Sequence, residues 1–176
     1  MRILMNGLLC AAFLFLALNS GAAPQLTIPR NIRFLVRVVR PLDTSKLKTG
    51  DLVQFELVTN VRGMKGEVVI PAGAHFRGKI ARVASLSSGE AQLAVLLTEV
   101  AWDGQNAKLA ACFNQAQPRE VQPASTAKGP ASTWSDLTVR DDPAFGAIIT
   151  SKVREVVLPE GTELYLQQCE LPPPSK

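Results

Sequence analysis

The residues best suited to chemistry are one histidine and one pair of adjacent acids. His75 directly follows a Pro-x-Gly turn, without a neighbouring Cys or a Ser in an elbow setting. A histidine base needs such a nucleophile within hydrogen-bond reach. Asp141 and Asp142 offer paired carboxylates, but adjacent residues of one backbone rarely face each other across a substrate. The sequence therefore predicts a protein that is not an enzyme.

The same inventory argues against cofactors, metals and nucleic acid. Gly63 and Gly66 do not form a phosphate loop, because their spacing is wrong and no Lys-Ser/Thr follows them. Two cysteines beyond residue 22 and one histidine, in no metal-like spacing, do not supply the four ligands of a zinc site. The chain has 19 basic and 15 acidic residues, far from the clustered positive charge of a nucleic-acid binder. We expect no cofactor and no nucleic-acid partner.

Residues 1–22 have the features of an export signal. Arg2 supplies the charged start, residues 8–18 are apolar, and Ser20-Gly21-Ala22 has the form of a cleavage site. This apolar run is too short and too early for a stop-transfer helix, and no other stretch is long and apolar enough to span a bilayer. We expect an exported protein, periplasmic or outer-membrane-associated, with no transmembrane segment after cleavage.

Export has a consequence for the cysteines. Signal removal takes away Cys10 and leaves Cys112 and Cys169. Disulfides form and persist in oxidising compartments, so one bridge between these two residues is the simplest pairing. The predicted bridge ties the end of one strand to the C-terminal segment.

The elements that would position these groups are organised around two copies of one decapeptide, EVVIPAGAHF at 67–76 and EVVLPEGTEL at 155–164. Each copy predicts a strand, a turn and a second strand. Pro71 and Pro159 suit the first central position of a type I turn, and Gly73 and Gly161 follow where the chain most often needs positive φ. The alternative is that two strands of a β-rich protein end in similar turns by chance.

Period-two alternation of apolar residues predicts further strands. Asp103-Gly104 predicts a tight hairpin, and Trp102 before it is expected to pack at the strand end. The predicted strands lie at 31–40, 51–61, 93–102, 107–113 and 165–170.

Two other stretches differ in character. Residues 114–136 are polar with three prolines, which predicts a flexible loop or a binding arm, since such a stretch buries little apolar surface. Asp142-Pro143, followed by Phe145, Ile148 and Ile149, has the pattern of a capped helix start. The prediction is therefore a single-domain, mainly β protein, an antiparallel barrel or sandwich with one short helix before the last strands. Its parts are a signal at 1–22, a leader and first strand at 23–40, the β domain at 41–171 and a tail at 172–176.

The stretch GEVVIPAGAHFRGKIARV, followed later by VAWDG, resembles the segment in which TrbI-like conjugal-transfer proteins run a strand into an I-P-x-G-[ST]-x-L-x-G turn. These proteins are the barrel-forming component of type IV secretion core complexes. The likeness covers residues 41–171 and the order of parts: an early strand pair around TGDLVQFELV, a short helical piece at FGAIITSKV, and a closing strand after LPEGTELYL.

The chain also departs from that family. A cleavable signal replaces the family's inner-membrane helix and proline-rich spacer, the helical piece is too short and polar to cross a bilayer, and Ala74 stands where Ser or Thr is commoner. The resemblance implies a barrel-like domain that assembles with copies of itself or with other envelope proteins, and it brings no catalytic residues.

These observations predict a non-catalytic exported protein that acts as a scaffold or accessory component of a secretion, conjugation or other envelope assembly. One alternative is a secreted small-ligand or glycan-binding β-barrel, with residues 114–136 as a lid and a pocket lined by Trp102 or Trp134. A secreted hydrolase is the third reading.

Overall fold

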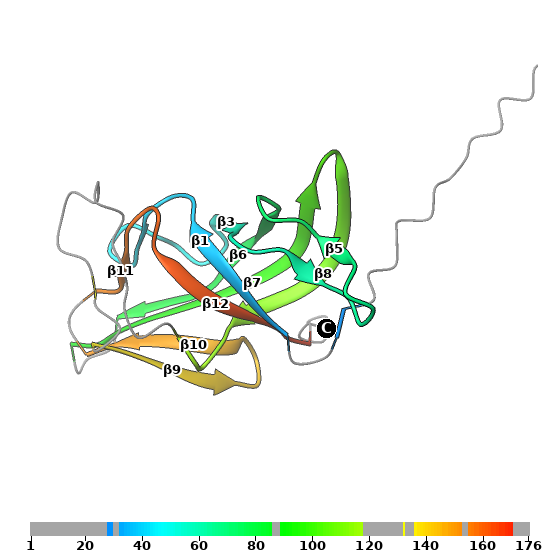
Figure 1. Cartoon of the computed structure of the whole chain (residues 1–176). Helices are drawn as coiled ribbons and strands as arrows, with labels where there is room; N and C mark the ends of the chain where they lie inside the picture. Colours follow the sequence, from blue (N-terminus) through cyan, green and yellow to red (C-terminus); the bar gives the residue numbers. More distant parts are fainter. Residues whose placement is uncertain are drawn as a thin grey trace, which may run out of the picture.

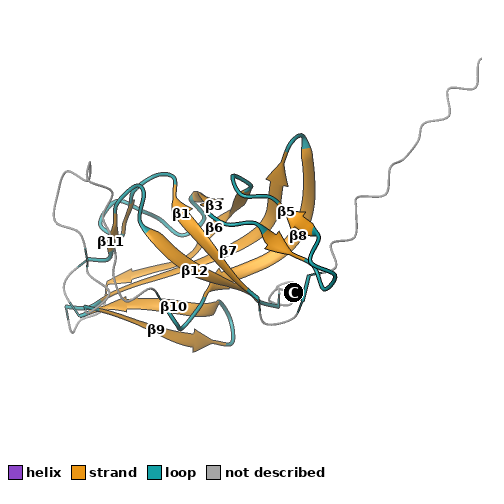
Figure 2. Cartoon of the chain, in the orientation of Figure 1, coloured by secondary structure: helices purple, strands orange, loops and turns teal. Residues whose placement is uncertain are grey.

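The computed structural model describes residues 28–29, 32–85, 89–117, 132, 136–152 and 155–170. Over these residues the regular elements are all strands, as Figure 2 shows. The predicted export signal at 1–22, the tail at 172–176, Trp134 and most of the predicted loop at 114–136 lie outside the described residues.

Six antiparallel strands close into a barrel. Their order around it is β6-β3-β1-β12-β8-β7, and the pairing of β7 with β6 completes the ring. The mainly β prediction is confirmed, with a barrel as its core. The six are β1 (Arg33–Val38), β3 (Leu52–Leu57), β6 (His75–Ser85), β7 (Ala91–Trp102), β8 (Gln105–Phe113) and β12 (Glu163–Gln168).

Three smaller pairs of strands are attached to the barrel. β9 (Leu137–Asp142) and β10 (Gly146–Ser151) form a hairpin, and β10 pairs with the first residues of β7. β2 (Leu42–Asp43) pairs with β11 (Val157–Leu158), and β4 (Val61–Arg62) pairs with β5 (Val68–Ile70). In the view of Figure 1, β11 lies at the left of the barrel, β5 at the right, and the β9–β10 hairpin beneath it. The β7–β8 hairpin rises at the upper right and turns at Asp103–Gly104, both at positive φ, as predicted.

Apolar side chains at alternate positions of the strands point inward and fill the inside of the barrel. Phe34, Phe55, Phe76 and Phe113 come from four different strands, and each is 0% exposed. The rings of Phe34 and Phe76 are 5.1 Å apart, and those of Phe55 and Phe113 are 6.5 Å apart in an edge-on arrangement. Such pairs contribute about 0.5–1.5 kcal/mol beyond the burial of their area. The interior is thus occupied by packed side chains.

The two decapeptides form equivalent corners. In each, the fourth residue of the turn donates its N–H to the proline carbonyl, from Ala74 to Pro71 at 3.2 Å and from Thr162 to Pro159 at 3.1 Å. The prolines therefore occupy the first turn position, one earlier than the sequence suggested. The glycines take the third position at φ 84° and 83°, as a type II turn requires.

Each corner is bound to the end of an earlier strand by two backbone hydrogen bonds. Gly73 donates to Leu57 O at 2.8 Å, and Leu57 N donates to Ala74 O at 2.7 Å. Gly161 and Val38 repeat this exchange at the end of β1. The two corners thus have the same surroundings. In one, β3 is followed by the β4–β5 pair, the corner and β6, and β6 pairs with β3. In the other, β1 is followed by the β2–β11 pair, the corner and β12, and β12 pairs with β1, so the decapeptides are a structural repeat and not a coincidence of composition.

The predicted helix after Asp142 is wrong, because the chain forms the β9–β10 hairpin there. The Asp142 Oδ1 accepts hydrogen bonds from the N–H groups of Ala144 at 2.9 Å and Phe145 at 3.1 Å. An Asp side chain that caps a helix can equally close a turn in this way. Gly146 then takes φ 76°, which a helix excludes, and the chain continues from it as β10, which pairs with β9 and β7.

The corner geometry generates the first prediction. A Cβ at Gly73 would have no heavy atom within 4 Å, so the positive φ alone penalises a side chain there. We expect Gly73→Val to lower the free energy of unfolding by about 1–3 kcal/mol in urea titration. Ala72→Val places the same side chain on the neighbouring turn residue and is the control. Equal, small effects of both changes would contradict the corner geometry.

Candidate functional site

The residues first considered for catalysis lie in separate places. His75 begins β6, opposite Glu56 of β3 and Ala101 of β7. Asp141 and Asp142 end β9, and Asp142 closes the hairpin turn. In the part of the chain that the structure describes, no cluster of His, Cys, Asp and Glu side chains is suited to hold a metal ion.

The two cysteines are neighbours on the outer face of the barrel. Cys112 of β8 stands opposite Gln167, and Cys169 donates its backbone N–H to Ala110 O at 3.1 Å. The residues are therefore diagonal partners across two antiparallel strands, a spacing at which side chains still meet. Both are recorded as free thiols.

The two thiols affect each other's ionisation. A hydrogen bond to Cys169, together with burial, raises the pKa of the Cys112 thiol. The same hydrogen bond lowers the pKa of Cys169, against an opposing effect of burial. Cys169 is thus the group of the pair that more readily becomes the nucleophilic thiolate.

The β9–β10 hairpin covers this pair. A Cβ at Gly146 would collide with Cys112 Sγ and would lie 3.3 Å from Cys169 Cβ. Only a glycine lets the hairpin backbone approach the sulfur so closely. Cys112 is consequently fully buried between the barrel wall and the hairpin.

A groove of about 520 Å³ opens on the outer surface of β3 and β6, beside the connection from β1 to β2. We call it the Leu52 groove. Leu52 is 86% exposed although it is large and apolar, and it stands in the outward column of β3 that continues with the polar Gln54 and Glu56. The other apolar side chains along the groove are those of Pro41, Leu42, Leu47 and Val53.

Charged side chains border the Leu52 groove. Arg40, Arg77 and Lys79 lie along it and are all exposed, and Glu99 is the carboxylate that lines it. Arg77 and Glu99 approach to 3.8 Å across β6 and β7. The groove therefore combines an apolar surface with an excess of positive charge.

No protein-family model, curated protein or solved structure matches this chain. Among the described residues, no helix has the length and apolarity needed to span a bilayer.

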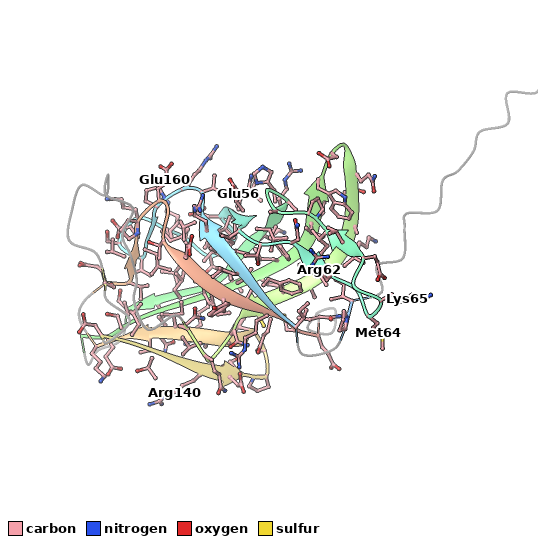
Figure 3. The ribbon with its side chains drawn as sticks, in the orientation of Figure 1. Glu56, Arg62, Met64, Lys65, Arg140 and Glu160 are labelled. Carbon is pink, nitrogen blue, oxygen red and sulfur yellow. The ribbon has the colours of Figure 1, made fainter. Side chains whose placement is uncertain are left out.

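A second, polar cleft of about 440 Å³ lies along β9 and β10. Arg140, Asp142 and Lys152 line it together with Thr138 and Thr150, so charges of both signs are mixed. Figure 3 shows Arg140 projecting from this hairpin, at the opposite side of the molecule from Glu56 and Glu160. Mixed charges at an edge strand are typical of a solvated surface.

Side chains fix both ends of the stretch that was predicted to be a loop. The Gln117 amide imitates a strand backbone, since its Nε2 donates to Tyr165 O at 3.1 Å and its Oε1 accepts from Tyr165 N at 2.9 Å. Ser132 donates its backbone N–H to Val157 O at 3.0 Å, and its hydroxyl oxygen accepts from Val157 N at 2.9 Å. The sequence pattern did not predict these hydrogen bonds, because single Gln and Ser residues in a polar stretch carry no periodic signal.

The Leu52 groove was also missed. Its signal in the sequence is one leucine on the outward side of an otherwise regular alternation, Leu52 before Gln54 and Glu56. Pro41, Leu42 and Leu47, which lie between β1 and β3 in the chain, meet Leu52 only after folding. Trp102, one of the residues expected to line a ligand pocket, instead packs against the core and lines neither the groove nor the cleft.

The disulfide stays a prediction, and the cysteine geometry sharpens its test. We expect mass spectrometry of the exported protein, alkylated without reduction, to find Cys112 and Cys169 in one linked peptide pair. Reduction should cost about 2–4 kcal/mol of stability. In the reduced, folded protein, iodoacetamide at neutral pH should modify Cys169 first, because its pKa is lowered and that of Cys112 is raised. Two free thiols in the exported protein would refute the bridge.

Proposed function

We propose that this chain is an exported, non-catalytic cell-envelope protein that acts as a scaffold or accessory component of a secretion, conjugation or other envelope assembly. The observation that carries the proposal is the Leu52 groove on the outside of a barrel whose inside is filled. Leu52 is 86% exposed and continues into the apolar lining of the groove, and an exposed apolar patch that is rimmed by charged residues marks an interaction site.

Because side chains fill the interior of the barrel, we infer that other molecules bind on its outer surface. A barrel that stores a small ligand needs an interior free of large side chains, whereas four buried phenylalanines occupy this one. This weakens the alternative of a secreted small-ligand or glycan-binding barrel. Docking of a partner on the outer face requires no such cavity.

The resemblance to the TrbI-like proteins supports the envelope setting. It rests on the Pro-x-Gly corners at Pro71, Gly73, Pro159 and Gly161, which stand at equivalent places in a barrel. Within 145–153, where the resemblance implied a short helix, the chain forms β10 at Gly146–Ser151. The resemblance therefore rests on the corners and the barrel, and the partners it implies are envelope proteins or further copies of this chain.

In-cell photo-cross-linking tests this function. A benzophenone amino acid at Leu52 should give discrete adducts in the envelope fraction, with an envelope protein or a second copy identified by mass spectrometry. Met64 is 82% exposed on the β4–β5 hairpin, which Figure 3 places at the right of the molecule, and it is the matched position. Adducts from Met64 alone would support an assembly but exclude the groove. A monomer that gives no adduct from either position and stays outside the envelope fraction would refute the function.

A further inference from the structure

The charges that border the Leu52 groove favour a negatively charged occupant. Three cations, Arg40, Arg77 and Lys79, face one carboxylate, Glu99. These cations come from the β1–β2 connection and from β6, so folding gathers them around one groove. An excess of positive charge along a groove attracts and orients anionic groups.

The ion pair between Arg77 and Glu99 at the groove is easily replaced. Arg77 Nη1 and Glu99 Oε1 lie 3.8 Å apart, and both side chains are about half exposed. Exposed pairs of this length contribute little to stability. A carboxylate of a partner can therefore take the place of Glu99 on Arg77, while Arg40 and Lys79 remain available to further acidic groups.

The apolar part of the groove calls for at least one large apolar side chain. Leu52 stands in water, with Pro41 and Leu47 beside it, and its burial under a partner would remove this exposure. Leu52 is 86% exposed at this groove, so an acyl chain lying against it would keep one side in water. A peptide segment resolves this conflict, because its apolar side chains can face the groove while its polar side chains and backbone face solvent.

We propose that the Leu52 groove binds an acidic segment of a partner protein, with a large apolar side chain against Leu52 and with carboxylates on Arg40, Arg77 and Lys79. This inference rests on the proposed function and names the chemistry of the partner. The binding site is formed by the outer surface of β3, β6 and β7 together with the segment between β1 and β3.

Selection from a random peptide library displayed on phage tests this chemistry with the full exported chain. We expect the selected peptides to be enriched in Asp and Glu together with Leu, Ile or Phe. Their affinity should fall with rising salt, because exposed charge pairs are screened. Isothermal titration calorimetry with a selected peptide, made synthetically, measures the effect of each variant.

The variants separate the apolar from the electrostatic contribution. Leu52→Glu should weaken binding by about tenfold or more, since it removes the apolar contact and adds repulsion. The double change Arg77→Glu with Lys79→Glu should have a similar effect. The matched control is Lys65→Glu with Arg140→Glu, which changes the net charge by the same amount. Figure 3 shows these two residues on the β4–β5 hairpin and on the β9–β10 hairpin, away from the groove. The control should leave the affinity for the peptide within about twofold.

Several outcomes would overturn the inference. Selected peptides that are basic or neutral, or whose binding the Leu52→Glu variant does not change, exclude an acidic occupant of this groove. Binding to phosphatidylglycerol vesicles that Leu52→Glu abolishes, without any acidic–apolar peptide, would assign the groove to a lipid surface. If the benzophenone at Leu52 gives envelope adducts but no acidic–apolar peptide is selected, this inference fails while the proposed function stands.

Discussion

The fold depends on two pairs of backbone hydrogen bonds that attach the Pro-x-Gly corners to the ends of earlier strands. One pair joins Gly73 and Ala74 to Leu57, and the other joins Gly161 and Thr162 to Val38. Each bond contributes about 1 kcal/mol net, but leaving the buried backbone groups of Leu57 or Val38 unpaired costs more. Because each corner starts a strand beside the one it is attached to, β6 follows β3 and β12 follows β1 around the ring. The corners thus determine which strands are neighbours.

Closure of the ring decides where the protein can act. Inward residues of the barrel strands meet in one core, and phenylalanines from β1, β3, β6 and β8 occupy its centre. What remains for other molecules is the outer surface, which the attached strands make uneven. The β9–β10 hairpin covers the cysteine pair, and the β1–β2 connection completes the Leu52 groove. Scaffold function in an envelope assembly is consistent with this division between a closed interior and a shaped exterior.

Much of the barrel could be predicted from the sequence, because alternation and turn chemistry are local signals. The inward positions of β1 and β3 and the Asp103–Gly104 turn were identified in this way. The helix prediction failed at Asp142-Pro143 because the same side-chain cap serves a helix start and a hairpin turn, and Gly146 at φ 76° decides between them. The groove could not be predicted, since Pro41 and Leu52 come together only through the tertiary fold. The corners were located correctly, but the turn position of their prolines depends on hydrogen bonds that a pattern does not specify.

Native-state hydrogen exchange followed by NMR tests the closed barrel most directly. The four amides of Val38, Leu57, Gly73 and Gly161 donate the hydrogen bonds that attach the corners. If the corners hold the barrel closed, these amides exchange only through global unfolding, at the same free energy as the central amides of β7. Exchange of Gly73 and Gly161 near the unprotected rate, while β7 stays protected, would contradict the closed barrel and the assignment of function to its outer surface.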